Sequence, residues 1–326
     1  MKMREYQTTI VRDDRIDSLK YWLIVLVIVA HVIMRDEFAG SATCAVLWNW
    51  ICIFAMPLFI FISGYFSRKK DKKDFWPSIW KLLEPLIIFH VVGLLFTGKT
   101  LSIGLILKPW YILWYLLSLI YWRFMLQIIP DKILRHKKII LISTCCISIM
   151  AGFLPFDKVL SIQRTLSLMP FFFLGYYMKG RNLYMPNKYK PFFIVFLVVI
   201  FAILYFFPHR IEDLLYAYPY KNIYGAAIRM AAFVLAIPMS IAFLNVCYST
   251  LWIARQGRMS MHYFIYHALM VKSIMMLAGK LNVPMSFVTA AIIIIGIIVG
   301  LFLILKIPYV KMFTNPSLFF MKSKVG

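Results

Sequence analysis

The sequence contains few acidic residues: 13 Asp and Glu stand against 36 Lys and Arg in a chain of 326 residues. Charged residues make up only 15% of the chain, whereas 62% of the residues are hydrophobic. A water-soluble core cannot hide that much apolar surface, and apolar runs near 20 residues are typical of membrane helices. The shortage of charge therefore excludes a soluble globular protein and predicts a multi-pass integral membrane protein.

The sequence also has no long polar segment: the longest polar connection between apolar segments holds only about 15 residues. Such connections leave no room for a domain outside the membrane, so we expect one membrane domain over residues 1–326, with cytoplasmic tails at 1–19 and 307–326. The net charge of +23 is explained by Lys and Arg retained in cytoplasmic loops. We expect no nucleic-acid partner.

The five cysteines are not spaced like the ligands of a metal ion, because they form no CxxC pair and no cluster with histidine. We interpret them as small buried hydrophobic residues and expect no metal. The first apolar run follows a charged tail and is not succeeded by a small-residue cleavage site, so we expect the first helix to remain in the mature protein.

What the sequence has in abundance is apolar segments. The ten segments run over residues 21–38, 45–66, 79–97, 109–129, 138–154, 165–179, 191–208, 224–247, 259–279 and 285–306. With the N-terminus inside, 26 Lys and Arg fall on the cytoplasmic side and 10 on the other side. The sequence therefore predicts an all-α polytopic helix bundle of about ten transmembrane helices, with both termini in the cytoplasm.

A histidine, His31, falls inside the first apolar segment, near the middle of the bilayer. Ionisable residues at such positions are functional candidates because lipid cannot replace their hydration. Lys20 lies eleven positions earlier, which places both on nearly the same helix face, roughly 16 Å apart, with Asp17 about 40° from that face. This stripe predicts a path from the cytoplasm to His31. Alternatively, Lys20 and Asp17 merely flank the helix, and His31 is hydrogen-bonded between helices.

Two stretches carry a resemblance to a known family. The segment at 16–32, IDSLKYWLIVLVIVAHV, and the segment at 56–69, MPLFIFISGYFSRK, resemble the bacterial acyltransferase-3 membrane proteins, especially the fucose 4-O-acetylase-like branch. The family hallmark is a basic residue followed by ten others and His, which here is Lys20 to His31. Weaker matches follow in the family order: WKLLEPLIIF at 80–89, ILWYLLSLIYWRF at 112–124, LMPFFFLGYYM at 168–178 and GRMSMHYFIYHAL at 257–269.

The sequence departs from the family pattern at a few positions. Lys stands at positions 20 and 81, where many members have Arg, and Lys lacks the planar fork that binds phosphate in a bidentate way. Trp114 is followed by Tyr115 and apolar residues, whereas the polysaccharide O-acetylase branch often has a Glu there. The periplasmic hydrolase-like domain of some members has no counterpart here.

The resemblance implies a bacterial inner-membrane enzyme that transfers an acyl group from acetyl-CoA or another acyl-CoA to a sugar hydroxyl, typically on a cell-envelope glycan or exopolysaccharide. A sugar hydroxyl needs a base, and a histidine with a pKa near 6.5 suits that task. We therefore predict His31 as the base, with Asp17 and Lys20 in the catalytic group. A covalent acyl-imidazole on His31 is the alternative.

Two sets of residues are predicted to bind the substrates. The first set lies near the cytoplasmic face and is expected to hold the CoA phosphates, with plain flanking charge as the alternative for its arginines: Lys20, Ser63, Gly64, Arg68, Lys81 and Arg123. The second set is expected to line an acceptor cavity near the outer face, with snorkelling to headgroups as the alternative for its cations: Trp114, Tyr115, Arg164, Arg229, His267 and Lys272. His90 is interpreted as a packed, hydrogen-bonded residue.

Two rival functions remain open from the sequence. A transporter or flippase of a glycan or glycolipid also suits a helix bundle with a central histidine, although no inverted repeat stands out. A structural subunit of an exopolysaccharide assembly complex would leave His31 without a purpose. The expected partners are acyl-CoA, a carbohydrate acceptor and membrane lipids, and the oligomeric state is open.

Overall fold

The computed structural model describes residues 12–34, 41–98, 102–156 and 158–317, and these ranges contain helices and no strand. The longer helices are α1 (Asp14–Ile33), α2 (Ala42–Tyr65), α3 (Lys72–Thr97), α5 (Trp114–Ile128), α7 (Lys137–Ala151), α8 (Ile162–Met178), α9 (Lys190–Ile203), α10 (Ile223–Val246), α12 (Ser260–Lys280) and α13 (Phe287–Ile304). Each of them coincides with one of the predicted apolar segments. Short helices complete the described chain: α4 (Ile103–Ile106), α6 (Asp131–Leu134), α11 (Leu251–Gly257) and α14 (Pro308–Thr314). The all-helical prediction is confirmed for the described residues.

Not all of these helices are long and apolar enough to cross a membrane by themselves. Within the described ranges, six meet both criteria: α1, α2, α3, α10, α13 and the segment Asn187–Phe206 that contains α9. Helices α5, α7 and α8 hold 15 to 17 residues, and α12 is less apolar. The structure thus supports a multi-pass membrane protein, while about ten spans and two cytoplasmic termini stay predictions.

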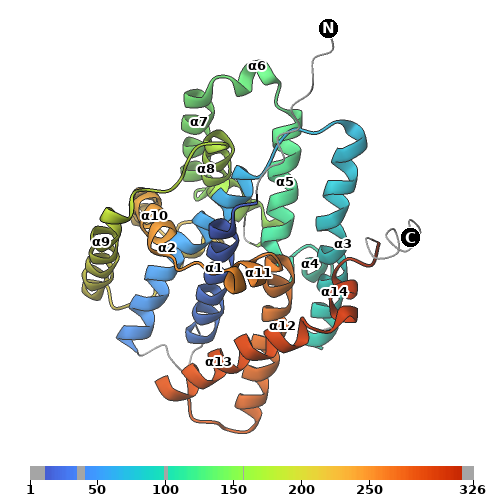
Figure 1. Ribbon diagram of the computed structural model, residues 1–326, viewed down its shortest axis with the longest axis vertical. Coiled ribbons are helices and arrows are strands. Elements are labelled where there is room, and N and C mark those ends of the chain that lie inside the picture. The colour runs from blue at the N-terminus through green and yellow to red at the C-terminus, as the bar shows by residue number, and fades with distance from the viewer. Residues whose placement is uncertain (1–11, 35–40, 99–101, 157, 318–326) are drawn as a thin grey trace.

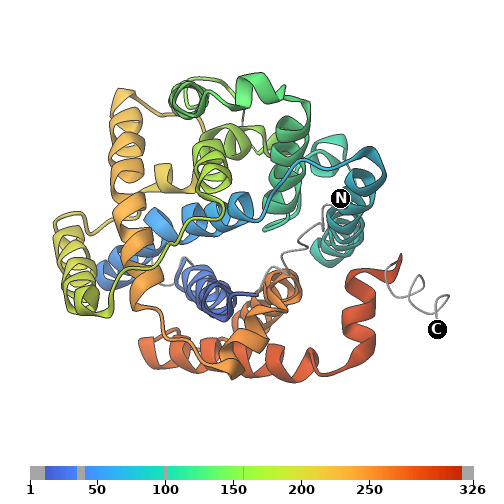
Figure 2. The ribbon, with the colours of Figure 1, turned by 45° about the horizontal axis from the view of Figure 1, so that its top comes forward.

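Helix α1 lies in the middle of the bundle and packs against α2, α11, α12 and α13 (Figure 1). Helix α2 crosses beside it and contacts α8 and α10, while α9 and α13 lie at the periphery (Figure 2). The most apolar window of α2 is 72% buried and that of α13 only 17%. Side chains with chemical roles are therefore expected on α1, α2 and their neighbours, because the peripheral helices present mostly apolar side chains to the outside.

Helices α2 and α8 cross with their backbones in contact. A Cβ atom on Gly64 would lie 1.9 Å from the carbonyl oxygen of Phe172, and one on Gly175 would lie 2.0 Å from that of Phe61. Small residues at such crossings let membrane helices approach closely. The backbone that approaches Gly64 in this structure is therefore that of α8, and the predicted contact of Gly64 with CoA stays a prediction.

Candidate active site

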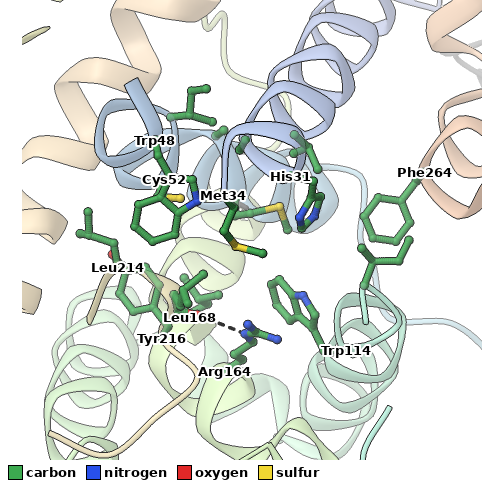
Figure 3. A pocket seen from close by; sticks show the side chains of 17 residues that line it. His31, Met34, Trp48, Cys52, Trp114, Arg164, Leu168, Leu214, Tyr216 and Phe264 are labelled. Carbon is green, nitrogen blue, oxygen red and sulfur yellow. Dashed lines mark hydrogen bonds between the residues drawn. The ribbon is translucent and has the colours of Figure 1, made fainter. Parts of the chain in front are cut away.

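His31 lies in the last turn of α1. It lines a cavity of about 690 Å³, open mouth included, between α1, α2, α5, α8 and α12, which we call the histidine cavity. Figure 3 shows His31 of α1, Trp114 of α5 and Arg164 of α8 facing the same space. The polar and aromatic side chains of its wall are His31, Trp48, Cys52, Trp114, Arg164 and Tyr216.

Two rings lie against the His31 imidazole. The His267 ring of α12 stacks on it, with centroids 5.7 Å apart and planes at 25°, and the Tyr111 ring lies 4.7 Å away on another side. His267 itself is fully buried. The sequence placed His267 in the acceptor site, and the structure brings it directly to His31; Tyr111 was not singled out.

The two imidazoles have incomplete hydrogen bonding. His267 Nδ1 lies 3.2 Å from the carbonyl oxygen of Tyr263, so this nitrogen is assigned as the N–H donor and Nε2 as the acceptor. His267 Nε2 and His31 Nδ1 are both buried without a hydrogen-bond partner among the described residues. Buried polar atoms are nearly always satisfied, and the exceptions concentrate at functional sites. The pair is therefore available to take up or release a proton.

Arg164 brings a permanent positive charge to the same cavity from the first turn of α8. Its guanidinium lies 4.7 Å above the Trp114 ring, and its Nε donates a hydrogen bond to the carbonyl oxygen of Leu215, 3.1 Å away (Figure 3). Stacking on an aromatic ring and a fixed hydrogen bond hold the planar donor group in one orientation. A cation held in this way can stabilise negative charge that develops beside His31.

The backbone around the cavity is unusual. Of the five described non-glycine residues with positive φ, three line the histidine cavity or the cavity that adjoins it: Tyr111 (φ 48°), Ser161 (φ 56°) and Tyr216 (φ 53°). Each such conformation costs about 1–3 kcal/mol and persists where the surrounding structure imposes it, often at functional sites. The conformation of Tyr111 accompanies the position of its ring against His31.

Asp17 and Lys20, predicted to act with His31, are not brought to it. They lie near the start of α1, about 21 Å and 16 Å along the helix from His31 at 1.5 Å per residue. Lys20 Nζ is 2.6 Å from Asp17 Oδ1. The shared helix face is real, but neither side chain reaches the reacting position, so their assignment to the catalytic group is corrected.

Asp17 instead anchors the start of α1. The carboxylate is buried, and its Oδ2 lies 2.6 Å from Arg12 Nε and 3.7 Å from Arg258 Nε. Arg258 Nη2 also lies 2.7 Å from Asp14 Oδ1. The preceding residue, Gly257, approaches so closely that a Cβ atom there would lie 1.7 Å from the Asp17 carbonyl oxygen. Charge pairing and close backbone contact thus fix α11 against α1.

A second site lies at the opposite ends of α1 and α2 from the histidine cavity. This cationic pocket, of about 1160 Å³ with its mouth, is lined by Tyr65, Phe66, Ser67, Arg68, Lys70, Phe75, Ser78, Arg123, Lys179 and Gly180. Its four cations have no carboxylate among the described lining residues. Arg123 donates to the Ser78 carbonyl oxygen and Lys179 to that of Ser67, at 3.3 Å and 3.4 Å. Such a concentration of cations binds phosphate groups.

The loop cations of this pocket affect one another. Burial lowers the pKa of Lys70, and the neighbouring charges of Arg123 and Arg68 lower it further. Burial and then the charge of Arg68 likewise lower the pKa of Lys179. Crowded like charges disfavour the charged form, and a bound anion relieves that repulsion. Both shifts therefore have the direction expected of buried, crowded cations.

The predicted acyl-CoA residues divide between this pocket and its surroundings. Arg68 and Arg123 line the pocket, and the Lys20 ammonium lies 5.7 Å from the ring of Phe66 at its edge. Lys81 is exposed on α3 and lines no part of the pocket.

Sequence reasoning did not identify two other cations of this pocket, Lys70 and Lys179. Lys70 stands within the basic stretch RKKDKKD and Lys179 directly after an apolar segment, where flanking charge seemed a sufficient explanation.

Ser63 lies between the two sites. Its Oγ is 2.6 Å from the hydroxyl of Tyr115, and its carbonyl oxygen accepts a hydrogen bond of 2.7 Å from Ser67, which lines the cationic pocket. The Tyr115 ring in turn packs 5.1 Å from that of Phe264, which lines the histidine cavity. Tyr115 therefore belongs to the partition between the sites and not to the acceptor cavity.

The remaining predicted acceptor residues also separate. Lys272 lies 4.7 Å above the Tyr111 ring, close to His31. Arg229 is fully buried, and its guanidinium nitrogens donate to Ser167 Oγ and to the carbonyl oxygen of Tyr218, at 3.1 Å and 3.3 Å. It lines neither the histidine cavity nor the adjoining one, so its predicted contact with the acceptor is replaced by a structural role behind the wall.

His90 has the packed role that the sequence predicted. Its Nε2 lies 3.1 Å from the carbonyl oxygen of Ile106, and its Nδ1 accepts a hydrogen bond from the backbone of Trp110. Within the described ranges, no three His, Cys, Asp or Glu side chains gather in a way that could hold a metal ion.

Comparison with known proteins assigns the chain to a family. Residues 13–306 match the profile of the acyltransferase-3 family, described as an acyltransferase domain. No significant match is found among the curated proteins or the solved structures. The family match begins with Asp13, the cap of α1, and ends two residues after α13, so it includes both sites. The chain therefore belongs to the acyltransferase-3 family and is a membrane acyltransferase.

Proposed function

We propose that the protein transfers an acyl group, of the acetyl type, from acyl-CoA to a hydroxyl group of a cell-envelope or exopolysaccharide sugar in the bacterial inner membrane, with His31 as the general base. The observation that carries the proposal is the His31–His267 pair, whose buried nitrogens lack partners among the described residues, beside Arg164 in an open cavity. A base that is not tied to an internal partner is free to accept a proton from a substrate.

The chemical step can be written on the residues of the cavity. His31 takes the proton of the acceptor hydroxyl while the oxygen attacks the thioester carbonyl carbon. The C–O bond forms, the C–S bond breaks, and the CoA thiolate leaves and takes the proton back from the His31 imidazolium. Arg164 stabilises the negative charge on the carbonyl oxygen during the attack. His267 holds the His31 ring in place by stacking.

The acyl-CoA is proposed to bind with its phosphates in the cationic pocket. Arg68, Lys70, Arg123 and Lys179 supply four charges there, and Phe66 and Phe75 offer apolar surface to the adenine. The acyl end then extends past Ser63 and Tyr115 toward His31, over the roughly 16 Å that separate Lys20 from His31 along α1. This route requires the Ser63–Tyr115 hydrogen bond to open.

The test is acyl transfer by the purified protein in proteoliposomes. Surface glycan from cells that lack the gene serves as acceptor and radiolabelled acetyl-CoA as donor. His31→Gln is expected to reduce the rate by at least about 100-fold, the loss typical of removing a general base. His136→Gln is the matched control, because His136 is exposed at the start of α7, away from both sites. Full activity of the folded His31→Gln protein would refute the role of His31.

The same preparation separates the two roles considered for His31. A covalent acyl-imidazole would retain label on the protein when acetyl-CoA is supplied without acceptor, and His31→Gln would abolish this label. Direct transfer leaves the protein unlabelled. Transport predicts instead that glycan crosses the bilayer without acyl-CoA.

The cationic pocket gives a pH prediction. Because the pKa values of Lys70 and Lys179 are lowered, these ammonium groups lose their charge at lower pH than ordinary lysines. The affinity for acetyl-CoA should therefore fall as the pH is raised from neutral toward alkaline, and binding in that range should take up protons. Calorimetry in buffers of different ionisation enthalpy measures both effects.

The Lys70→Met, Lys179→Met double variant is expected to bind acetyl-CoA about tenfold more weakly at neutral pH and to lose most of the pH dependence. Lys188→Met is the control, since Lys188 is exposed and lines neither site. If the double variant bound acetyl-CoA with unchanged affinity, the acyl-CoA would bind outside the cationic pocket.

A further inference from the structure

The space beside His31 extends beyond the histidine cavity. A second cavity, the middle cavity, holds about 950 Å³ with its mouth and shares lining residues with the first, including His31, Trp114 and Arg164. Two further cavities of about 1160 Å³ and 1420 Å³, mouths included, adjoin the middle cavity. Because each of them shares lining residues with the middle cavity, the three cavities lie next to one another.

The two further cavities lie on different sides of the middle one. The first, the lysine side, shares Pro109, Tyr111 and Lys158 with the middle cavity. The second, the acidic side, shares Met34, Leu215 and Tyr218 with it. The lysine side and the acidic side have no described lining residue in common. We call this row of three neighbouring cavities the outer groove; of the three, only the middle cavity is lined by His31.

The wall of the outer groove combines aromatic rings with charged side chains. Lys158 lies 4.8 Å from the ring of Tyr218, as Arg164 lies above Trp114 and Lys272 above Tyr111. Lys108 adds charge to the lysine side, and the acidic side adds Arg210, Glu212, Asp213 and Lys221. Aromatic faces with a few placed polar groups match sugar rings and their hydroxyls. The charged side chains at both ends of the groove disfavour a bound acyl chain, because hydrocarbon would displace the water that solvates them.

Resting on the acyl transfer proposed above, we propose that the acceptor is a chain of several sugars that lies along the outer groove and is acylated on an internal sugar. Small-ligand pockets have about 300–1,000 Å³, and the middle cavity, with about 310 Å³ of internal space, lies at the lower end of that range. A monosaccharide or a sugar nucleotide would fill that section and leave both sides empty. A longer chain fills all three sections only when an internal sugar lies at His31.

The experiment uses the unacylated surface glycan from cells that lack the gene, cut by mild acid and separated into fractions of one, two, four and more sugars. Transfer from acetyl-CoA by the purified protein is measured for each fraction. We expect kcat/KM to rise about tenfold or more between the shortest and the long fractions and then to level off. Tandem mass spectrometry of the long products should place the acetyl group on internal sugars.

Two variants test the ends of the groove. Lys108→Gln on the lysine side and Glu212→Gln on the acidic side should each raise KM for long acceptors about fivefold, with kcat and the activity on the shortest fraction unchanged. Lys188→Gln is the matched control, because this exposed lysine lies outside the groove. A merely structural effect of either variant would lower activity on all fractions alike.

The outcomes separate this inference from the function on which it rests. Equal kcat/KM for one sugar and for long chains would overturn the inference and leave acyl transfer intact, as would acetylation of terminal sugars only. Acetylation of no fraction by a folded protein would overturn the acyl transfer itself. Length dependence that both end variants reduce would support the outer groove as the acceptor site.

Discussion

The two ends of α1 differ in how their polar groups are satisfied. At the start of the helix, the buried carboxylate of Asp17 has ion-pair contacts with Arg12, Lys20 and Arg258. In the last turn, His31 stacks on His267, and each ring keeps a buried nitrogen without a hydrogen-bond partner in the part of the chain that the structure describes. Satisfied networks rigidify a structure, whereas unsatisfied groups cost stability and persist where they serve a function. The first end therefore holds the bundle together, and the second is left open for chemistry.

The largest effect on stability is expected from Gly257→Ala, at the end of α11, where this helix contacts the start of α1. The new Cβ would lie 1.7 Å from the backbone oxygen of Asp17, so α11 and α1 must separate. We expect a loss of about 3 kcal/mol, at the upper end of ordinary overpacking. Thermal unfolding in detergent, followed by tryptophan fluorescence, measures it.

Gly279→Ala is the matched control on α12. A Cβ there meets no atom within 4 Å, so the change is expected to stabilise the protein by about 0.5 kcal/mol through the higher helix propensity of Ala. If Gly257→Ala did not lower the free energy of unfolding any more than this control does, the close contact between α11 and α1 would be refuted.

A smaller loss is expected from Asp17→Asn. The variant keeps the shape but removes the charge that faces the three cations, and we expect it to cost about 2 kcal/mol. This is below the cost of breaking a fully buried pair, because 58% of the Arg12 side chain and 40% of the Arg258 side chain remain exposed to solvent. The same unfolding measurement applies, and added salt should narrow the difference between the two proteins. A variant as stable as the parent would show that the cluster does not anchor α1.

The smallest effect on stability is expected at the other end. His31→Gln removes a ring whose Nδ1 has no described hydrogen-bond partner, so the free energy of unfolding should change by less than about 1 kcal/mol while acyl transfer is lost. Unfolding and activity measured on one preparation decide this. A large loss of stability would mean that His31 is a packing residue, and the contrast between the two ends would fail.

Much of the fold could be predicted from the sequence. Each of the ten apolar segments coincides with a helix, because the signal for a membrane helix is local and depends on composition over about 20 residues. Lys20 and His31 lie on one helix, as their spacing indicates. The end of this helix was placed too late in the sequence, since α1 ends at Ile33 and not near residue 38. Helix boundaries depend on caps and on packing as well as on apolar content.

The candidate site could be predicted only in part. His31 and Arg164 line the cavity, and His267 and Lys272 lie close by, as expected for polar residues within apolar segments or at their ends. Tyr115 and Arg229 face elsewhere, because the depth of a residue in the bilayer does not say toward which neighbour it points. Tyr111 carried no signal of its own in the sequence.

What the sequence determined by itself is therefore the class of protein, its helices and the histidine on α1, because these follow from hydropathy and from the geometry of a single helix. Only the tertiary structure decided which residues meet. Asp17 and Arg258 are more than 200 positions apart, as are His31 and His267, and Gly64 meets Phe172 across two helices. Such contacts depend on how the helices pack, and helical periodicity carries no information about the partner.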